Sequence, residues 1–331
     1  MIRCSKYFFM TILLIHLSSI RIMAEQSVVI YTSVDQIFSE PILKEFEKTS
    51  GIKVKAVYDV EASKTVGLEK RLIAEKSMPK ADIFWNSEYL RTLRLQKAGV
   101  LTPYTSKQTE DIPREYISPS KHWAGFGIRA RVFVVNTNLV SPEETPKKLE
   151  DLINPKWKGK TAIAKPFFGT TSTHFAALYV KWGKEKYIDF LKALKANEIA
   201  ILPGNSNVRD AVVRGRYAFG LTDTDDVNVA LKQKKPVIMV YPNQEIGGTF
   251  AIFHTLAKVA DGPNPENAQK LLDYLLSRKA ETDLLKSGAV QISVRPDMNA
   301  DTFQPKLWYI ATEELLTVLK PSADLVRQYL E

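Results

Sequence analysis

Short apolar runs alternate with amphipathic stretches along the chain, as is typical of strands that alternate with helices. Three apolar runs near the beginning predict strands: residues 28–32, 52–58 and 81–85. The stretches between them predict helices. The first helix runs from about Ser39 to Gly51, and the second lies near residues 62–75 and ends before Pro79. Strands and helices in this order predict an α/β fold with a parallel sheet covered by helices.

Two later segments predict strands that cross between lobes. Residues 123–136 alternate apolar side chains with Arg129 and Arg131, and this stretch is long enough to run from one lobe to another. Residues 249–253 are a second candidate. Between them, residues 161–164 begin another set of strands and helices. We therefore predict two α/β lobes joined by two crossover strands, with a cleft between the lobes.

The length of the chain agrees with two domains, because domains commonly contain about 100–200 residues. We predict one lobe from residues 25–125 plus 250–300, and the other from residues 126–249 plus 301–331. Open α/β sheets bind ligands at the carboxyl ends of their strands. We therefore expect the site in the loops after Tyr31, Trp85, Ala164 and Leu221.

The first residues predict an export signal. Arg3 and Lys6 precede an apolar run from Tyr7 to Ile20, and small and polar residues follow. This order is typical of a secretory signal peptide, residues 1–24, which we expect to be cleaved after Ala24. A membrane anchor is the alternative, but the run is shorter than the ~20 apolar residues that a membrane-spanning helix needs. We expect a periplasmic protein.

Loss of the signal peptide changes the composition. The formal charge falls from +9 to +6, because Arg3, Lys6 and Arg21 are lost without any acidic residue. The single cysteine, Cys4, is lost as well, which excludes disulfides, thiolate ligands and cysteine nucleophiles. The remaining lysines are scattered and no aromatic–basic run accompanies them. We therefore expect no nucleic-acid partner.

Hydroxyl and amide residues precede two predicted helices of the second lobe. Residues 169–173 (Gly-Thr-Thr-Ser-Thr) come before a helix predicted at 174–182, and residues 204–207 (Gly-Asn-Ser-Asn) come before one predicted at 208–214. Backbone N–H groups and hydroxyls at helix starts bind anions. Ordinary helix capping explains the same residues. The repeated arrangement favours a phosphate, phosphonate or carboxylate group between the two helix starts.

An acidic cluster follows the strand predicted at residues 217–221. Asp223, Asp225 and Asp226 lie within four residues of one another. They fit three interpretations: a hard cation bound through oxygen, an amine of the ligand, or a cap on the helix predicted at 227–231. Phosphoryl chemistry at a bound metal would make the protein a secreted metal-dependent hydrolase, which is the alternative function. No sequence motif for nucleophilic or nucleotide chemistry supports an enzyme.

Five segments carry a resemblance to a known family: residues 29–33 (Val-Ile-Tyr-Thr-Ser), 81–88 (Ala-Asp-Ile-Phe-Trp-Asn-Ser-Glu), 164–171 (Ala-Lys-Pro-Phe-Phe-Gly-Thr-Thr), 220–226 (Gly-Leu-Thr-Asp-Thr-Asp-Asp) and 265–276. They resemble the periplasmic substrate-binding proteins of ABC importers, in the branch that contains ferric-iron-binding proteins. The resemblance covers nearly the whole mature chain. It implies the two-lobed type II, or Venus-flytrap, fold and a clamp that delivers a solute to a permease in the inner membrane.

The resemblance also implies a set of iron ligands, and the sequence departs from it. Iron-binding members hold ferric ion with two adjacent tyrosines, helped by a first-loop side chain and a carboxylate near the third strand. Here Asp35 stands in the first loop, Ser87 or Glu88 at the carboxylate position, and Thr224–Asp225 in place of the tyrosines. The hydroxyl-rich segment 168–171 is better preserved. The cargo is thus ferric iron with an anion, or a small phosphorylated or phosphonate-type anion.

These considerations define the expected site. The expected ligand-binding residues are Tyr31, Ser33, Asp35, Trp85, Asn86, Ser87, Phe168, Gly169, Thr170, Thr171, Asn205, Ser206, Asp223, Asp225 and Tyr241. If the cargo is a metal ion, its expected ligands are Asp35, Glu88, Asp223 and Asp225. We expect a monomer that requires no cofactor.

Overall fold

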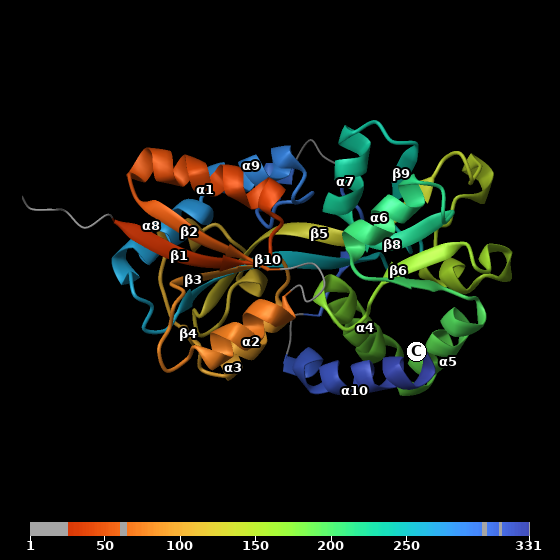
Figure 1. Cartoon of the computed structure of the whole chain (residues 1–331), viewed down its shortest axis with the longest axis horizontal. Coiled ribbons are helices and arrows are strands. Elements are labelled where there is room, and N and C mark those ends of the chain that lie inside the picture. The colour runs from red at the N-terminus through yellow and green to blue at the C-terminus, as the bar shows by residue number, and fades with distance from the viewer. Residues whose placement is uncertain (1–25, 60–64, 300–302, 311–312, 331) are drawn as a thin grey trace, which may run out of the picture.

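The computed structural model describes residues 26–59, 65–299, 303–310 and 313–330. The predicted signal peptide lies outside these residues. Two α/β lobes lie side by side, and long strands run through the middle of the molecule from one lobe to the other (Figure 1). No helix among the described ranges is long and apolar enough to cross a membrane.

Lobe 1 contains the first strands of the chain. β1 (Ser27–Thr32) pairs in parallel with β2 (Lys53–Tyr58) and β3 (Ile83–Asn86), which confirms the predicted parallel sheet, and β4 (Leu101–Thr102) is a short edge strand. α1 (Gln36–Ser50) and α9 (Arg278–Ser287) lie on one side of this sheet, and α2 (Val66–Ala74) and α3 (Leu90–Lys97) lie on the other (Figure 1). α8 (Pro265–Leu275) buries the stripe formed by Ala268, Leu271, Leu272 and Leu275.

Lobe 2 repeats this arrangement. β6 (Thr161–Ala164) pairs in parallel with β7 (Ala200–Leu202) and β8 (Phe219–Asp223), and β9 (Val237–Val240) lies beside the crossover strand β5. α6 (Asn205–Val213) and α7 (Thr224–Lys232) lie on one side. On the other, α10 (Glu313–Tyr329) packs against α4 (Gly169–Trp182) and α5 (Lys184–Ala196) (Figure 1).

Two long strands join the lobes. β5 (Trp123–Asn136) has the predicted bounds, and all of its residues are buried. It pairs with β10 (Thr249–Val259) in lobe 1 and with β8 in lobe 2, always antiparallel. β10 also pairs with β3 and with the short strand β11 (Leu307–Trp308). The two predicted crossover segments are therefore strands that belong to both lobes.

Three helices of lobe 2 begin earlier than the sequence predicted. α4 begins at Gly169 instead of residue 174, α6 at Asn205 instead of 208, and α7 at Thr224 instead of 227. Hydroxyl, amide and acidic side chains are poor in helix interiors, which suggested loops. In the first turn, however, the same side chains serve N–H groups that lack partners. The polar segments are thus helix starts and not loops.

Candidate ligand-binding site between the lobes

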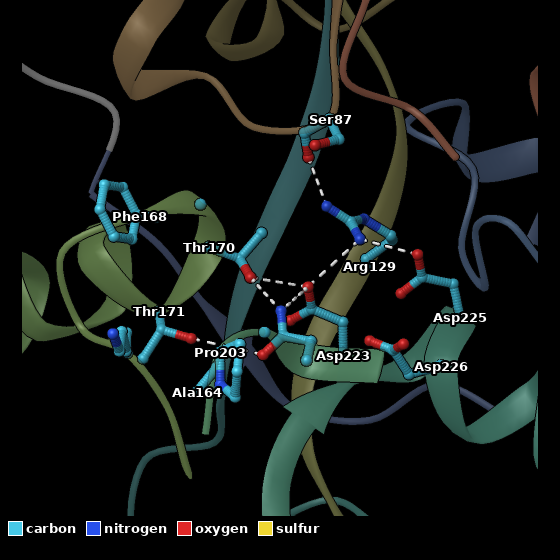
Figure 2. A pocket seen from close by; sticks show the side chains of 14 residues that line it. Ser87, Arg129, Ala164, Phe168, Thr170, Thr171, Pro203, Asp223, Asp225 and Asp226 are labelled. Carbon is cyan, nitrogen blue, oxygen red and sulfur yellow. Dashed lines mark hydrogen bonds and ion pairs between the residues drawn. The ribbon is translucent and has the colours of Figure 1, made fainter. Parts of the chain in front are cut away.

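A small cavity of about 30 Å³ lies where the two lobes meet (Figure 2). Lobe 1 contributes Ser87, from the turn after β3, and the crossover strand β5 contributes Arg129. The other lining residues come from strand ends and helix starts of lobe 2: Ala164, Lys165, Phe168, Gly169, Thr170, Thr171, Pro203, Gly204, Asn205, Asp223, Asp225 and Asp226. The cavity therefore lies at the carboxyl ends of the lobe 2 strands, where α/β sheets bind ligands.

Three helices begin at this cavity. The residues that precede α4, α6 and α7 are Phe168, Gly204 and Asp223, and none of them caps its helix with a side-chain hydrogen bond. α7 carries Asp225 and Asp226 in its first turn, whereas α4 and α6 carry no acidic residue there. A helix start combines free N–H groups with a partial positive charge. The starts of α4 and α6 are thus suited to an anion.

The pairing register of β5 and β8 brings together the charged side chains at the centre of the site. Arg131 on β5 lies directly opposite Asp223 on β8 in the antiparallel pair. Directly opposite side chains of such a pair are in contact. The guanidinium of Arg131 lies 2.5 Å from the Asp223 carboxylate, and both side chains are fully or almost fully buried.

Arg129 lies on the same face of β5, because side chains two residues apart on a strand point the same way. Its Nη1 is 2.8 Å from Asp225 and 3.2 Å from Asp223, and its Nη2 donates to the backbone oxygen of Ser87 at 2.6 Å (Figure 2). Burial by itself lowers the pKa of Arg129, but the carboxylates of Asp225 and Asp223 outweigh it and hold the pKa above its ordinary value. Arg129 is therefore a permanent cation that connects the lobes.

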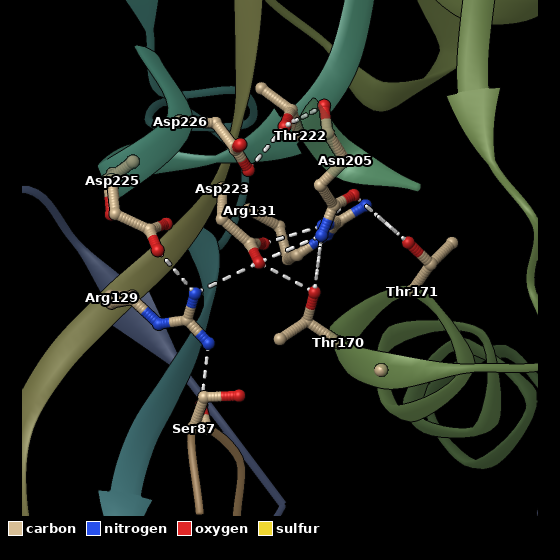
Figure 3. A network of polar contacts seen from close by, with 12 residues as sticks. Ser87, Arg129, Arg131, Thr170, Thr171, Asn205, Thr222, Asp223, Asp225 and Asp226 are labelled. Carbon is tan, nitrogen blue, oxygen red and sulfur yellow. Dashed lines mark hydrogen bonds and ion pairs between the residues drawn. The ribbon is translucent and has the colours of Figure 1, made fainter. Parts of the chain in front are cut away.

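Hydroxyl and amide groups complete the shell around Asp223 (Figure 3). Thr170 donates to the carboxylate at 2.7 Å, and the Asn205 amide donates to it at 3.0 Å. Arg131 also donates to Thr171 at 3.1 Å. Burial raises the pKa of Asp223, yet Arg131 and Arg129 more than compensate and hold this pKa below its usual range. The carboxylate is ionised and fully engaged.

The three aspartates of the acidic cluster come together, with carboxylate oxygens within 4.8 Å of one another. Each has an arginine nearby. Asp226 lies 3.6 Å from Arg209 and accepts a hydrogen bond from Thr222 at 3.0 Å. The helix-cap interpretation and the two ligand interpretations, a cation or an amine, each have a structural counterpart, since Asp225 and Asp226 stand in the first turn of α7 and also line the cavity. A cation bound here would compete with three guanidinium groups.

The structure brings about half of the expected ligand residues to the cavity: Ser87, Phe168, Gly169, Thr170, Thr171, Asn205, Asp223 and Asp225. The lining does not include Tyr31, Ser33, Asp35, Trp85, Asn86, Ser206 or Tyr241. The Tyr31 hydroxyl donates to Glu75 at 2.9 Å, and Ser33 donates to Asn86 at 2.7 Å. Trp85 packs against Phe126 and His254 in the core, and Tyr241 packs against Phe303.

The expected set of metal ligands is not assembled either. Glu88 is fully buried and accepts hydrogen bonds from the backbone N–H groups of Leu90 and Arg91, at 2.6 Å and 3.0 Å. It therefore holds the start of α3. It also accepts a hydrogen bond from Thr173 of lobe 2 at 3.1 Å. Glu88 and Asp35 do not line the cavity with Asp223 and Asp225.

The sequence prediction missed the two arginines of β5. Both were visible as charged residues inside a strand that is otherwise apolar, but no role was assigned to them. A signal was available: two buried cations on one strand face need anionic partners, and buried charges are almost always paired. Lys165 and Pro203 also line the cavity and carried no such signal, whereas Gly204 belongs to the predicted segment 204–207.

Comparisons with known proteins define the class of this protein. Residues 78–308 match the family described as bacterial extracellular solute-binding protein, so the chain belongs to this family. Iron uptake protein A1 of Synechocystis sp. is 28% identical over 273 residues, covering 80% of this chain and 74% of that protein. A putative 2-aminoethylphosphonate-binding periplasmic protein of Salmonella typhimurium is 24% identical over 246 residues, covering 72% and 68%.

Solved structures confirm the predicted two-lobed type II fold. Apo ferric ion-binding protein A of Pasteurella haemolytica superposes with a TM-score of 0.80 at 24% identity, covering 92% of this chain and 98% of that one. The periplasmic binding protein AfuA of Actinobacillus pleuropneumoniae, with fructose 6-phosphate bound, gives 0.79 at 22% identity, covering 93% and 98%. The protein is a solute-binding protein by family, and the alternative of a secreted hydrolase receives no support.

Proposed function

We propose that this protein is the periplasmic solute-binding component of an ABC importer, and that its solute carries a phosphate- or phosphonate-type group. The starts of α4 and α6 carry the proposal, because both open into the cavity between the lobes without an acidic residue or a side-chain cap. Such a pair of helix starts favours an anion with several oxygens. Lys165 lines the same cavity and adds a positive charge.

The acidic side of the cavity suits a cationic or hydroxylated part of the same solute. Asp225 and Asp226 lie at the start of α7, across the cavity from Thr171 (Figure 2). An amine or sugar hydroxyls would donate hydrogen bonds to these carboxylates. The names of two related proteins, which refer to 2-aminoethylphosphonate and fructose 6-phosphate, agree with this chemistry.

Ferric iron is the second candidate cargo. The closeness of the three aspartates favours it, and so do the names of several relatives. Two observations favour the organic anion instead. No described residue that lines the cavity is a tyrosine, histidine or cysteine, and Arg129 lies beside the carboxylates that would hold the metal.

Calorimetric titration distinguishes the two cargoes. We expect binding of 2-aminoethylphosphonate or fructose 6-phosphate, at least tenfold weakened in Thr171→Val and in Lys165→Gln. Lys147→Gln, an exposed lysine of lobe 2, is the matched control. With ferric citrate we expect no visible phenolate-to-iron absorption band. Tight ferric binding with such a band, and no binding of the phosphorylated probes, would falsify the proposal.

Transport completes the proposal. We propose that the two lobes, with the boundaries predicted above, close on the solute and present it to an inner-membrane permease, and that the protein is a monomer. Two contacts between the lobes support a closing motion: Arg129 donates to Ser87 at 2.6 Å and Thr173 donates to Glu88 at 3.1 Å. Hinged closure around a ligand commonly uses a few contacts of this kind.

A further inference from the structure

A second hollow adjoins the candidate site. This open groove, which we call the side groove, has a volume of about 800 Å³. It lies between α2 and α3 of lobe 1 and α4 and α10 of lobe 2 (Figure 1). Lys165 and Phe168 line both the side groove and the cavity described above. A solute held in the cavity can therefore extend into the side groove.

The side groove is strongly positive. Six cationic side chains line it: Lys70, Arg91, Arg94, Lys165, Lys320 and Arg327. The single acidic lining residue is Asp324, which pairs with both Lys320 and Arg327 at 2.9 Å. Lys70 and Lys165 have no ion-pair partner in the described part of the chain. A hollow that concentrates one sign of charge attracts the opposite charge.

Arg91 is the buried part of this surface. Only 3% of it is exposed. It shares one carboxylate, that of Glu69, with Arg94, at 3.4 Å and 3.0 Å. Its Nε has no hydrogen-bond partner among the described residues, and its Nη2 reaches Ser172 of lobe 2 at 3.4 Å. Glu88 also acts electrostatically on Arg91, so two carboxylates offset the two guanidinium groups, and the Arg91 Nε is the group left without a hydrogen-bond acceptor among the described residues.

Apart from Ser172, the rest of the lining is apolar. Val66, Phe167, Leu316 and Leu319 lie beside the cationic side chains, and Arg327 stacks on Phe167 at 4.9 Å from its ring centre. This combination suits a carbon chain or ring that ends in an anionic group. It does not suit a bare inorganic ion, which would gain nothing from the apolar part.

We propose that the side groove receives a second anionic group of the same solute, so that the cargo is an organic molecule with two anionic groups. This inference rests on the proposed function. The first group lies at the starts of α4 and α6, and the second lies among Lys70, Arg94 and Lys320. Both lobes then hold the solute, because Lys70 and Arg94 belong to lobe 1 whereas Lys320 belongs to α10.

Calorimetry with two series of probes tests the inference. One series is alkylphosphonates, and the other is α,ω-alkylene bisphosphonates with the same chain lengths. We expect at least one bisphosphonate to bind tenfold or more tightly than the alkylphosphonate of equal length. In Lys70→Gln/Lys320→Gln this advantage should fall below threefold, while alkylphosphonate affinity stays within twofold. Lys97→Gln/Lys107→Gln removes two exposed charges elsewhere and should change neither.

Three other outcomes would contradict the inference. If no bisphosphonate binds more tightly than the alkylphosphonate of equal chain length, the side groove holds no second anionic group. The inference is then overturned, while the proposed function stands. If Lys70→Gln/Lys320→Gln weakens both series equally, the groove only attracts anions at long range, which also overturns the inference. If wild-type protein binds neither series, both the inference and the proposed anion site fail.

Discussion

The two faces of the cavity use polar residues in opposite ways. On the lobe 1 face, polar side chains at the ends of β1 and β3 bond to one another: Ser33 reaches Asn86 at 2.7 Å and Ser87 at 3.1 Å, and Asn86 reaches Thr92 at 3.2 Å. On the lobe 2 face, three helices begin at the cavity around the buried pair of Arg131 and Asp223. Lobe 1 contributes only Ser87 to the described lining.

This difference indicates which lobe offers the groups that can bind the solute. Polar groups that satisfy one another hold a turn in shape but offer little to a ligand. Helix starts and a lysine with no ion-pair partner among the described residues offer N–H groups and charge to an anion. We infer that, within the cavity, lobe 2 supplies most of the groups that recognise the solute and lobe 1 covers it.

The largest effect should come from the charged centre of lobe 2. Asp223→Asn leaves Arg131 and Arg129 buried without that carboxylate, and breaking a buried pair costs about 3–5 kcal/mol. We expect this loss in the free energy of unfolding, measured by urea denaturation at pH 7. The control is Asp324→Asn, whose partners are exposed and which should cost less than about 1 kcal/mol. Equal losses in the two variants would contradict the comparison.

Paired substitutions on the two faces test recognition directly. Asn205→Ala removes an amide that lines the cavity at the start of α6, and we expect about tenfold weaker phosphonate binding, since a hydrogen bond to a charged group contributes about 1.5–3 kcal/mol. Ser33→Ala should leave the affinity within twofold. Calorimetric titration of both variants with the same phosphonate measures the two affinities. A larger loss of affinity in Ser33→Ala would place recognition in lobe 1.

The pH dependence of stability should reveal the charged centre of lobe 2. Burial and the nearby Arg131 hold the pKa of His174 well below its ordinary value. The unfolded chain takes up a proton near pH 6.5 while the folded chain does not, so stability falls as the pH drops below about 6.5. This group can account for about 1.4 kcal/mol per pH unit.

His174→Phe isolates that contribution and keeps the stacking on Phe250. We expect the loss of unfolding free energy between pH 7 and pH 5.5 to be smaller in the variant than in the wild type, by urea denaturation at each pH. His122→Phe, which replaces a half-buried histidine of lobe 1, is the control variant. Identical pH profiles for His174→Phe and wild type would contradict this account, because they would show that folding leaves the pKa of His174 unchanged.

The smallest effect should come from the contact between the faces. Thr173→Val removes the hydrogen bond from lobe 2 to Glu88. We expect this loss to shift the equilibrium between the closed and open forms by about 1 kcal/mol toward the open form. Small-angle X-ray scattering should report a larger mean radius of gyration for the unliganded variant. Thr282→Val, at a half-buried position of α9, is the control. An unchanged radius would mean that this contact does not bias closure.

Periodicity along the sequence was enough to predict several elements. β5 has the predicted bounds because its alternating pattern extends over the whole strand, and α8 buries the predicted stripe. The strand β7 was missed, since three half-buried residues give no clear period. The starts of α4, α6 and α7 were placed too late, because their polar first turns have the composition of loops.

The sequence by itself determined the alternation of strands and helices, the crossover strand and the position of the polar segments that we propose to bind an anion, all of which depend on neighbouring residues. Only the tertiary structure decided which charges meet. Arg131 and Asp223 are 92 residues apart, and the register of β5 against β8 places them opposite each other. A local pattern carries no information about register between distant strands. For this reason the sequence presented the acidic cluster as a candidate cation, amine or capping site but did not reveal that its carboxylates are also the partners of buried arginines.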